Sequence, residues 1–509
     1  DPKKYDPGLF LNLISRAKGD GHNPLQYKDA ARDFMQEMTA EVWERYDAIL
    51  FKEKALDFDD LLAKTAHLLE RADIRERYAK VWKYIHIDEY QDTNKVQYKI
   101  ANHLAAAHNN ICAVGDADQN IYSWRGATIE NILHFEKDYP NTTVITLEKN
   151  YRSTKTILAA ANAVIEKNSM RKKKTLYTDN VAGEKISLSA SYSETEEARA
   201  IADSARDLIE TGLSPREIAV LYRTNFQSRV LEEAFIKKNI PYQLLGVKFF
   251  ERKEVKDVLS YVKASLNPES VADISRIINV PPRGIGKVTL AKIVGGEEDS
   301  LPPGMRDKIA DFRKLLSDIR EEIKEKKASD VIRFIIQESG IEKILLSGDM
   351  EDEDRLLNVR ELVSVASQYD HLKPEEGIEA FLTNAALATD QDELNENTDS
   401  VKLMTVHAAK GLEFDHVFIA GLEQDLFPFK HSDDGDMSQH EAEEERRLFY
   451  VALTRARKKI HLSYSLVRKI YGTERVNTPS EFIEDIEKNL IEDSIPPKPT
   501  GAKAIFIDF

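Results

Sequence analysis

Two adjacent carboxylates, Asp88 and Glu89, directly follow an apolar run, Val81–Ile87, that is typical of a buried strand. In open α/β sheets, the residues that follow a strand lie at the carboxyl edge of the sheet, where ligands bind. There, one carboxylate can hold Mg²⁺ and the next can orient or deprotonate a water, as in ATP-hydrolysing proteins. The simpler interpretation is an acidic turn, which is common for a bare Asp-Glu pair.

A second polar segment follows the predicted strand Ile111–Val114. Gly115 lets the backbone turn closely after that strand. Gln119 then supplies a neutral donor that could contact a γ-phosphate or its attacking water. Because both strands would end at the same sheet edge, Gln119 is expected near the two carboxylates.

Aromatic and basic side chains alternate a few residues later, at Tyr122, Trp124 and Arg125. Rings interleaved with a cation suit stacking on the bases of a single strand, at about 1–3 kcal/mol per base. Core packing is the commoner fate of Tyr and Trp. The surrounding Gly, Asp, Gln, Asn and Ser residues make a core strand a poor interpretation of this segment.

Arg152 lies just before a predicted helix, Lys155–Glu166, and after a predicted strand, Val144–Leu147. At the carboxyl edge of that strand, its guanidinium could stabilise charge on a transferring phosphoryl group. Tyr151 could stack on a nucleobase. A surface Arg–carboxylate pair is the simpler alternative for any single Arg.

Two further segments lie near the C-terminus. The predicted strand Val401–Thr405 leads into His407, Lys410 and Glu413, which could contact DNA phosphate or a ribose hydroxyl, although a lone His is more often structural. Residues 441–457 are predicted as one helix with Arg455 near its end; a charged amphipathic helix would explain only its first half.

These strings together resemble superfamily 1 DNA helicases of the UvrD/Rep/PcrA family. Asp-Glu-Tyr-Gln-Asp-Thr resembles motif II, the segment with Gln119 resembles motif III, and Asn-Tyr-Arg-Ser resembles motif IV. Thr-x-His-x-x-Lys-Gly-Leu-Glu resembles motif V and Leu-Thr-Arg-Ala resembles motif VI. The resemblance covers nearly the whole chain, up to about residue 490.

The resemblance implies a role for each of these side chains. Asp88 would hold Mg²⁺, Glu89 would activate water and Gln119 would sense the γ-phosphate. Arg152 and Arg455 would act as arginine fingers, with Tyr151 and Glu413 also binding the nucleotide. The expected DNA contacts are Tyr122, Trp124, Arg125, His407 and Lys410.

The implied activity is ATP- and Mg²⁺-dependent 3′→5′ translocation on single-stranded DNA, with unwinding at single-strand/duplex junctions. Repair or replication proteins are the implied partners. The net charge of −16 over 509 residues does not exclude DNA, because phosphate binding depends on local patches. One basic cluster is Arg171–Lys174, for which a solvated face is the simplest interpretation.

The bulk composition, with 42% hydrophobic and 31% charged residues, is that of a globular protein. The only cysteine, Cys112, excludes an intramolecular disulfide and is predicted to be a core residue of its strand. No apolar run reaches the roughly 20 residues needed to span a bilayer, and no signal peptide is visible. A cytoplasmic protein is expected.

Strand and helix patterns alternate up to about residue 264, then helical patterns dominate, and the alternation returns near residue 401. This order predicts an α/β fold, which the resemblance sharpens to two RecA-like motor domains with inserted helical subdomains. The predicted parts are a helical subdomain 1–52, motor domain 53–145, second motor domain 146–264 and 391–490, helical insertion 265–390, and tail 491–509.

A phosphate-cradling P-loop requires Gly-x-x-x-x-Gly-Lys-Ser/Thr, and the 509 residues contain no such string. In the family this loop lies upstream of motif II. The sequence therefore leaves two interpretations open: a helicase whose P-loop segment is missing from this chain, or a truncated, non-catalytic DNA-binding fragment. The expectation is that this chain alone is inactive.

Overall fold

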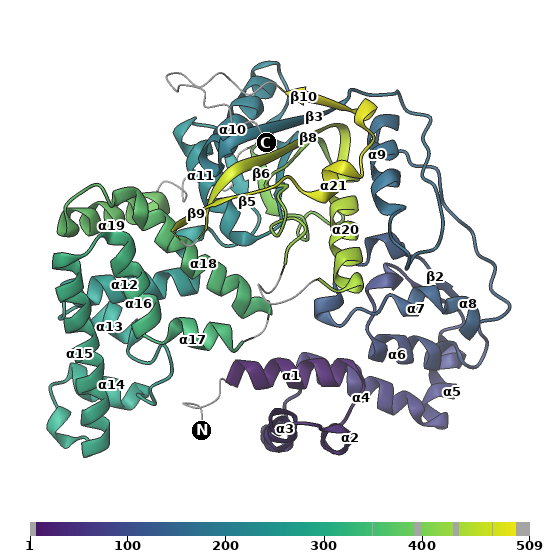
Figure 1. The fold of residues 1–509 in the computed structure, drawn as a ribbon. Helices are drawn as coiled ribbons and strands as arrows, with labels where there is room; N and C mark the ends of the chain where they lie inside the picture. Colours follow the sequence, from purple (N-terminus) through teal and green to yellow (C-terminus); the bar gives the residue numbers. More distant parts are fainter. Residues whose placement is uncertain (1–6, 349, 391–398, 431–436, 471, 495–509) are drawn as a thin grey trace. The chain divides into compact units, whose positions relative to one another are not determined.

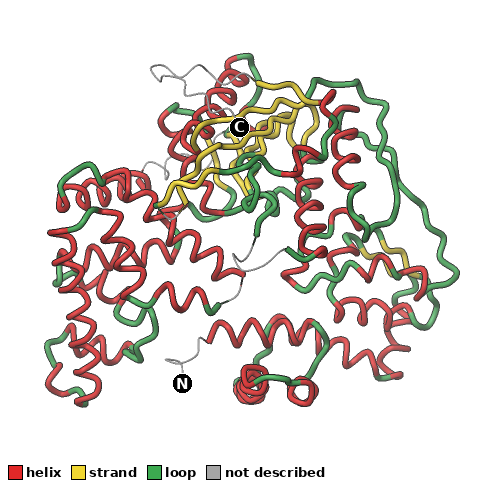
Figure 2. Tube along the Cα trace, in the orientation of Figure 1, coloured by secondary structure: helices red, strands yellow, loops and turns green. Residues whose placement is uncertain are grey.

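The computed structural model describes residues 7–348, 350–390, 399–430, 437–470 and 472–494. The chain divides into two compact units, each built from separate stretches (Figure 1). Unit 1 is Asp1–Thr146, Met170–Lys173 and Phe249–Asp392; unit 2 is Leu147–Ser169, Lys174–Lys248 and Glu393–Phe509. Unit 1 is mostly helical, and the large sheet belongs to unit 2 (Figure 2). Residues 1–6 and 391–398, and the 495–509 part of the predicted tail, lie outside the described residues.

Unit 1 begins with a group of helices: α1 Pro7–Gly19, α2 Pro24–Ala30, α3 Phe34–Lys52, α4 Phe58–Glu70 and α5 Ala72–Val81. Asn23, Asp33 and Asp57 cap α2, α3 and α4 by accepting a backbone N–H with their side chains. Trp43 of α3 is 1% exposed and packs in a small core with Ile14. A short break, residues 31–33, separates α2 from α3.

The α/β part of unit 1 contains a parallel pair of strands, β1 Ile85–Ile87 and β2 Ile111–Ala113, joined through α6 Lys95–Ala105. Two short helices follow, α7 Glu130–Leu133 and α8 Phe135–Asp138. The prediction that Cys112 is a core residue was wrong, because it lies on an exposed position of β2. In this two-stranded sheet, the described residues do not cover both faces of the strand that carries the thiol.

The predicted strand Val144–Leu147 is also wrong, since these residues have no strand conformation. Ile145 is 77% and Leu147 is 78% exposed, and the nearest ladder contact is a single bridge between Lys149 and Tyr177. A β-branched run forms a strand only where a neighbouring strand completes its hydrogen bonds. The described residues supply no such neighbour here.

The helical insertion has its own hydrophobic core. Its helices are α12 Lys253–Leu266, α13 Val271–Ile277, α14 Lys287–Val294, α15 Pro303–Glu325, α16 Ala328–Glu338, α17 Ile341–Leu346, α18 Met350–Ala366 and α19 Pro374–Asp390. The core begins at Phe249, earlier than the predicted boundary at residue 265. Val255, Val258 and Val262 of α12 are fully buried in it, although charged residues are frequent at the start of that helix.

Unit 2 is built around one sheet in the order β10-β3-β8-β7-β4-β6-β5, with β9 added beside β8. All pairs are parallel except β8 with β9, so the predicted α/β fold with a parallel sheet is confirmed. The strands are β3 Ile186–Ser193, β4 Ile218–Tyr222, β5 Tyr242–Leu244, β6 Val401–Thr405, β7 Phe414–Ile419, β8 Ala456–Ile470, β9 Thr473–Val476 and β10 Ile491–Ser494. The helices are α9 Lys155–Ile165, α10 Glu194–Glu210, α11 Ser228–Lys237, α20 Gln439–Leu453 and α21 Glu481–Glu484.

Two differences concern the end of unit 2. The helix predicted over residues 441–457 ends at Leu453, where the Thr454 hydroxyl donates to the Val451 carbonyl and the chain passes directly into β8. The sheet also continues beyond residue 490, because β10 pairs in parallel with β3. A four-residue edge strand of mixed polarity carries too weak a pattern to be separated from a tail.

A buried cluster of charges joins α10, the end of β7 and β8. Arg468, which is 2% exposed, donates to the Glu423 carboxylate at 2.8 and 2.6 Å and to the Glu197 carboxylate at 2.7 Å. Ser463 and Ser465 complete the shell by donating hydroxyl hydrogen bonds to Glu197 and Glu423. Burial raises the pKa of Glu197, whereas for Glu423 the attraction of Arg468 outweighs burial and lowers the pKa.

Among the described residues, the helices are either too short or too polar to cross a lipid bilayer.

Candidate functional site

The carboxyl edge of β1 and β2 brings two polar loops together. The Val114 N–H donates to the Ile87 carbonyl at 2.8 Å, and the Tyr90 N–H donates to the Val114 carbonyl at 2.9 Å. The chain therefore turns at the same level after both strands. Asp88 and Glu89 follow one strand and are exposed, while the loop that begins at residue 115 follows the other.

Gln91 connects these two loops. Its side-chain amide donates to Glu89 Oε2 at 2.5 Å, and its carbonyl oxygen accepts the Asp116 N–H at 2.9 Å. Gln119 Nε2 in turn donates to Asp116 Oδ2 at 2.9 Å. The predicted pair Glu89 and Gln119 thus belongs to one hydrogen-bond network. An amide side chain, which both donates and accepts, is suited to the fully buried central position that Gln91 occupies.

Gln91 and Asp116 were not among the residues predicted for the site. Gln91 belongs to the string Asp-Glu-Tyr-Gln-Asp-Thr, and Asp116 directly follows Gly115. Gln91 follows Tyr90, which is fully buried and anchors the turn. An amide that comes directly after a buried aromatic residue at a sheet edge was the available signal.

Gly115 is required by the close approach of the two loops. A Cβ at this position would lie 2.5 Å from Gln91 Oε1 and 3.1 Å from the Tyr90 backbone nitrogen. Neither atom belongs to a flexible side-chain end, because the Gln91 amide is held on both sides. Any side chain at residue 115 would therefore push apart the network that connects Glu89 and Gln119.

Glu89 has an unusual backbone conformation, with φ of 49° in the left-handed region. Asp88 Oδ1 accepts the Glu89 N–H at 2.9 Å, and the 3₁₀ turn Tyr90–Asp92 follows. Few residues other than Gly adopt this conformation, and it concentrates at functional sites. The two carboxylates of the acidic pair have different hydrogen-bond partners, since Asp88 Oδ1 accepts the Glu89 N–H and Glu89 Oε2 accepts the Gln91 amide.

The donor set fits a magnesium nucleotide better than a bare metal ion. No group of three metal-ligating side chains occurs in the described parts of the chain. Mg²⁺ commonly uses one or two carboxylates together with phosphate oxygens and waters. Asp88 offers such an exposed carboxylate at the edge where ligands of α/β sheets bind.

The aromatic segment forms a 3₁₀ turn, Ser123–Arg125, and not a core strand. The Arg125 guanidinium carbon lies 4.5 Å from the centre of the Trp124 ring and 5.7 Å from that of Tyr122. The two rings are tilted by 57° with their centres 6.4 Å apart, and Trp124 is 45% exposed. Asn120, which is buried, bonds this segment to the Gln91 carbonyl at 2.6 Å. The exposed Trp124 ring and Gln119 therefore lie on one short loop.

Arg152 occupies a different place in unit 2 from the one predicted. It lies beside the amino ends of β7 and β8, because its guanidinium donates to Glu413 Oε2 at 2.5 Å and to the Thr454 carbonyl at 3.2 Å. This hydrogen bond from Arg152 holds the pKa of Glu413 below its usual range. Tyr151, the neighbouring candidate, is 78% exposed, with the Lys149 ammonium 5.3 Å from its ring centre.

Arg455 lies between the end of α20 and the start of β8 and is only 3% exposed. Within unit 2 its guanidinium donates to the carbonyls of Val451 at 3.0 Å and Leu412 at 3.2 Å. These bonds hold Arg455 against the residue that precedes Glu413. The structure thus places Arg152, Glu413 and Arg455 at the same edge of the sheet.

Arg457 joins this group but was not selected from the sequence. Its Nη1 lies 3.5 Å from Glu413 Oε1, and its Nε donates to Asp415 Oδ1 at 2.7 Å. It also pairs with Glu217. Arg457 is the second Arg of the string Thr-Arg-Ala-Arg, and its place two residues after Arg455 could have indicated that it belongs to the same group.

His407 and Lys410 lie on the connection between β6 and β7 and are half-buried. The connection starts at the carboxyl end of β6, where the Val406 N–H donates to the Tyr222 carbonyl. It ends with Glu413, at the amino end of β7. The two DNA candidates and the nucleotide candidate Glu413 therefore lie on one connection that runs between opposite edges of the sheet.

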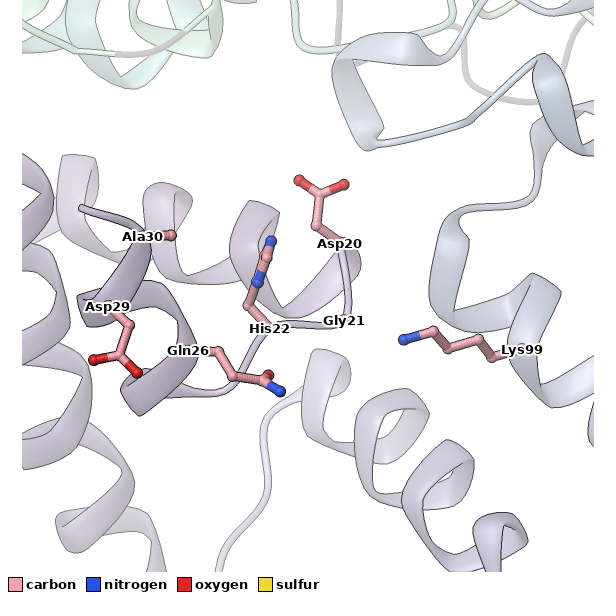
Figure 3. A pocket seen from close by; sticks show the side chains of 7 residues that line it. All are labelled: Asp20, Gly21, His22, Gln26, Asp29, Ala30 and Lys99. Carbon is pink, nitrogen blue, oxygen red and sulfur yellow. The ribbon is translucent and has the colours of Figure 1, made fainter. Parts of the chain in front are cut away.

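A cavity of about 550 Å³ lies elsewhere in unit 1, where the α1–α2 connection and α2 face α6 (Figure 3). Its lining residues are Asp20, Gly21, His22, Gln26, Asp29, Ala30 and Lys99. The Lys99 side chain points toward Gly21, and Asp20 pairs with Lys95 at 2.7 Å. None of the predicted site residues lines this cavity.

Two family models match the chain. Residues 1–140 match the UvrD/REP helicase N-terminal domain, and residues 145–466 match the UvrD-like helicase C-terminal domain. Among the relatives, the ATP-dependent DNA helicase PcrA of Staphylococcus aureus is 41% identical over an alignment 518 residues long, which covers 97% of this chain and 70% of the relative. The protein of the same name from Staphylococcus epidermidis gives the same identity and coverage.

Proposed function

Because the chain belongs to the UvrD/REP family of ATP-dependent DNA helicases, with RecA-like α/β motor domains, we propose that it moves along single-stranded DNA in the 3′→5′ direction. In this proposal, the protein unwinds duplex DNA at single-strand/duplex junctions, in repair or replication. The proposed nucleotide is ATP, in keeping with the relatives named ATP-dependent DNA helicases, and Mg²⁺ is its proposed metal ion.

One observation carries the proposal. A single loop, residues 115–126, contains the Gln119 that bonds through Asp116 and Gln91 to Glu89, and the Trp124 ring suited to base stacking. A change in the contact between Gln119 and the γ-phosphate would move Trp124, because only four residues of backbone separate the two side chains. This is the connection that a motor needs between hydrolysis and movement on the strand.

Each candidate residue then has a proposed role. Asp88 holds Mg²⁺, which neutralises phosphate charge when bound, and Glu89 orients or deprotonates the attacking water. Arg152 and Arg455 stabilise charge on the transferring phosphoryl group. Tyr151 and Glu413 bind the base and ribose; the proposed DNA contacts are Tyr122, Trp124, Arg125, His407 and Lys410.

The Arg152–Glu413 pair suggests how the arginine is kept ready. Glu413 holds the guanidinium in one orientation, with Arg152 Nε donating to Glu413 Oε2 at 2.5 Å. A pre-positioned guanidinium loses less side-chain entropy when it engages a phosphate.

The test is the substitution Glu89→Gln, made in a form of the protein that also carries a P-loop. The change keeps the size of the side chain but removes the base, so DNA-stimulated ATP hydrolysis should fall by about 10²–10⁴-fold. Binding to a single-stranded oligonucleotide should change less than about twofold, because the Glu89 carboxylate takes no part in stacking on the DNA bases. The matched control is Glu76→Gln, at an exposed position of α5, which should leave both properties unchanged. Retained hydrolysis in Glu89→Gln would refute the role of this residue.

A second candidate function follows from the absence of any Gly-x-x-x-x-Gly-Lys-Ser/Thr string in the 509 residues. Without that loop, the β- and γ-phosphates lack the backbone cradle and lysine that usually hold them. The 509-residue chain alone would then bind single-stranded DNA without hydrolysing ATP. Hydrolysis of ATP by this chain, stimulated by DNA, would exclude this candidate.

A further inference from the structure

Four residues, Met170–Lys173, pack with unit 1, although the stretches on both sides of them belong to unit 2. We call these four residues the 170–173 segment. On the N-terminal side the chain is bonded to α20: Asn168 Nδ2 donates to the Glu443 carbonyl at 2.8 Å, and the Ser169 hydroxyl donates to Glu443 Oε1 at 2.6 Å. The chain thus leaves an anchored position in unit 2 immediately before the segment begins.

The segment is attached to unit 1 by a forked ion pair. Arg171 Nε donates to Asp118 Oδ1 at 3.0 Å, and Arg171 Nη2 donates to Asp118 Oδ2 at 2.8 Å. The side chains of Arg171 and Asp118 are only 7% and 1% exposed. Lys172 adds an outer pair with Glu136 at 2.5 Å, in which both side chains are substantially exposed. Within the basic cluster, the Arg171 side chain is therefore buried, whereas Lys173 is exposed to solvent.

Asp118 belongs to the short 3₁₀ turn Ala117–Gln119 that carries the proposed γ-phosphate sensor. From the other side, Asp116 Oδ1 accepts the Asp118 N–H at 2.9 Å while its Oδ2 accepts the Gln119 amide. The turn is thus held by Asp116 on the side of the Gln91 network and by Arg171 on the other. Release of Arg171 would remove the two-point contact at Asp118 from this turn.

A buried ion pair is a poor device for stability alone, because desolvation consumes most of the attraction and an apolar pair of similar size often serves better. A two-point guanidinium–carboxylate contact does fix both distance and orientation. The desolvation cost of a buried ion pair can therefore be offset where the pair must hold a neighbouring group in a fixed position. Here that group is the turn that contains Gln119.

We propose that Arg171 is a positioning residue, which acts through Asp118 to hold Gln119 in the geometry needed for ATP hydrolysis. The 170–173 segment then sets the conformation of the phosphate-sensing turn through this ion pair within unit 1. The inference rests on the proposed function of Gln119.

The first test uses the 509-residue chain and does not depend on catalysis. In Arg171→Ala, amide hydrogen exchange in residues 116–120 should become about tenfold faster, while exchange in β2 and α6 stays unchanged. The matched control is Lys172→Ala, which removes the exposed pair of the same segment and should change exchange in residues 116–120 less than about twofold. Unchanged exchange in Arg171→Ala, or equal acceleration throughout unit 1, would overturn the proposal.

The second test measures ATP hydrolysis in the P-loop-bearing form. Arg171→Ala should lower kcat by about 10- to 100-fold with little change in KM, because a misplaced sensor affects the transition state more than ground-state binding. The double variant Arg171→Ala/Asp118→Ala should be no slower than the slower single variant, since the two residues act as one unit. Additive losses would contradict action through Asp118.

The variant Gln119→Ala distinguishes the proposed phosphate contact of Gln119 from the proposed positioning role of Arg171. Loss of hydrolysis in Gln119→Ala with normal hydrolysis in Arg171→Ala would refute only the positioning role. Normal hydrolysis in Gln119→Ala would refute the proposed function of the sensor, whatever the behaviour of Arg171→Ala.

Discussion

Replacement of Arg468 by methionine should destabilise unit 2 severely. Methionine fills much of the space of the arginine stem but leaves Glu197 and Glu423, which are 3% and 1% exposed, without their shared cation. The loss of one partner from a buried ion pair costs about 3–5 kcal/mol. That amount lowers the ratio of folded to unfolded protein by about 10²–10⁴-fold, at 1.36 kcal/mol for each factor of ten. It is a large part of the roughly 5–15 kcal/mol that a domain has in total.

The location of the tryptophans makes this loss easy to assign. The sequence has three, Trp43, Trp82 and Trp124, and all of them lie in unit 1. In urea titrations of Arg468→Met, far-ultraviolet circular dichroism should show an early transition that tryptophan fluorescence does not follow. The control Arg475→Met, on the exposed strand β9, should leave both transitions in place.

The pH dependence gives a second readout of Arg468→Met. Without the arginine, burial should raise the pKa of both carboxyl groups above their unfolded values, so protonation on folding becomes favourable at low pH. The deficit in the free energy of unfolding should therefore shrink as the pH falls from 7 to 5. Replacement of both glutamates by glutamine in the same variant should restore most of the loss. A loss below about 1 kcal/mol would refute the view that the arginine compensates two buried charges.

Three other changes test separate parts of the structure. Burial lowers the pKa of His461 from 6.5 to about 3, so only the unfolded state gains a proton between these pH values. The free energy of unfolding should therefore fall as the pH decreases from about 6.5 to 3, by at most about 1.4 kcal/mol per pH unit. In urea titrations, His461→Gln should make the free energy of unfolding less dependent on pH in this range. Trp124→Ala should raise the Kd for single-stranded DNA about 5- to 150-fold in fluorescence anisotropy, from a loss of about 1–3 kcal/mol of stacking, whereas Trp82→Ala, also at an exposed ring, should not. Gly115→Ala should cost about 1–3 kcal/mol in thermal or urea unfolding, because its Cβ meets a fixed amide oxygen at 2.5 Å, whereas Gly304→Ala, with no atom within 4 Å, should cost much less.

The proposed catalytic edge of unit 1 was predictable because the residues that form it are close together in the sequence. Each strand and the polar residues that follow it are contiguous in the sequence, and parallel pairing then places Asp88 and Gln119 at one edge. Gln91 was missed because its role depends on two partners at once, and a pattern of residue types does not show which side chains meet. The same limit applies to Arg457.

The position of Arg152 could not be predicted from its own surroundings. Its main partner, Glu413, is 261 residues away, and the strand assumed to precede it does not form in the described chain. Apolar β-branched residues such as Ile145 indicate a strand only if a partner exists, and partner choice is a long-range property. The same reasoning explains Cys112, whose exposure depends on what covers a two-stranded sheet.

The left-handed conformation of Glu89 has a consequence for how this sequence can change over time. Glycine adopts a φ of 49° without strain, whereas this backbone conformation costs glutamate about 1–3 kcal/mol of conformational free energy. Glu89→Gly should therefore relieve this strain while it removes the proposed base. At residue 89, the change that would increase the free energy of unfolding would also decrease the rate of the proposed ATP hydrolysis. In a lineage that no longer needs hydrolysis, drift at this position should run toward glycine or asparagine, so the retention of glutamate would be a mark of continued selection for the motor.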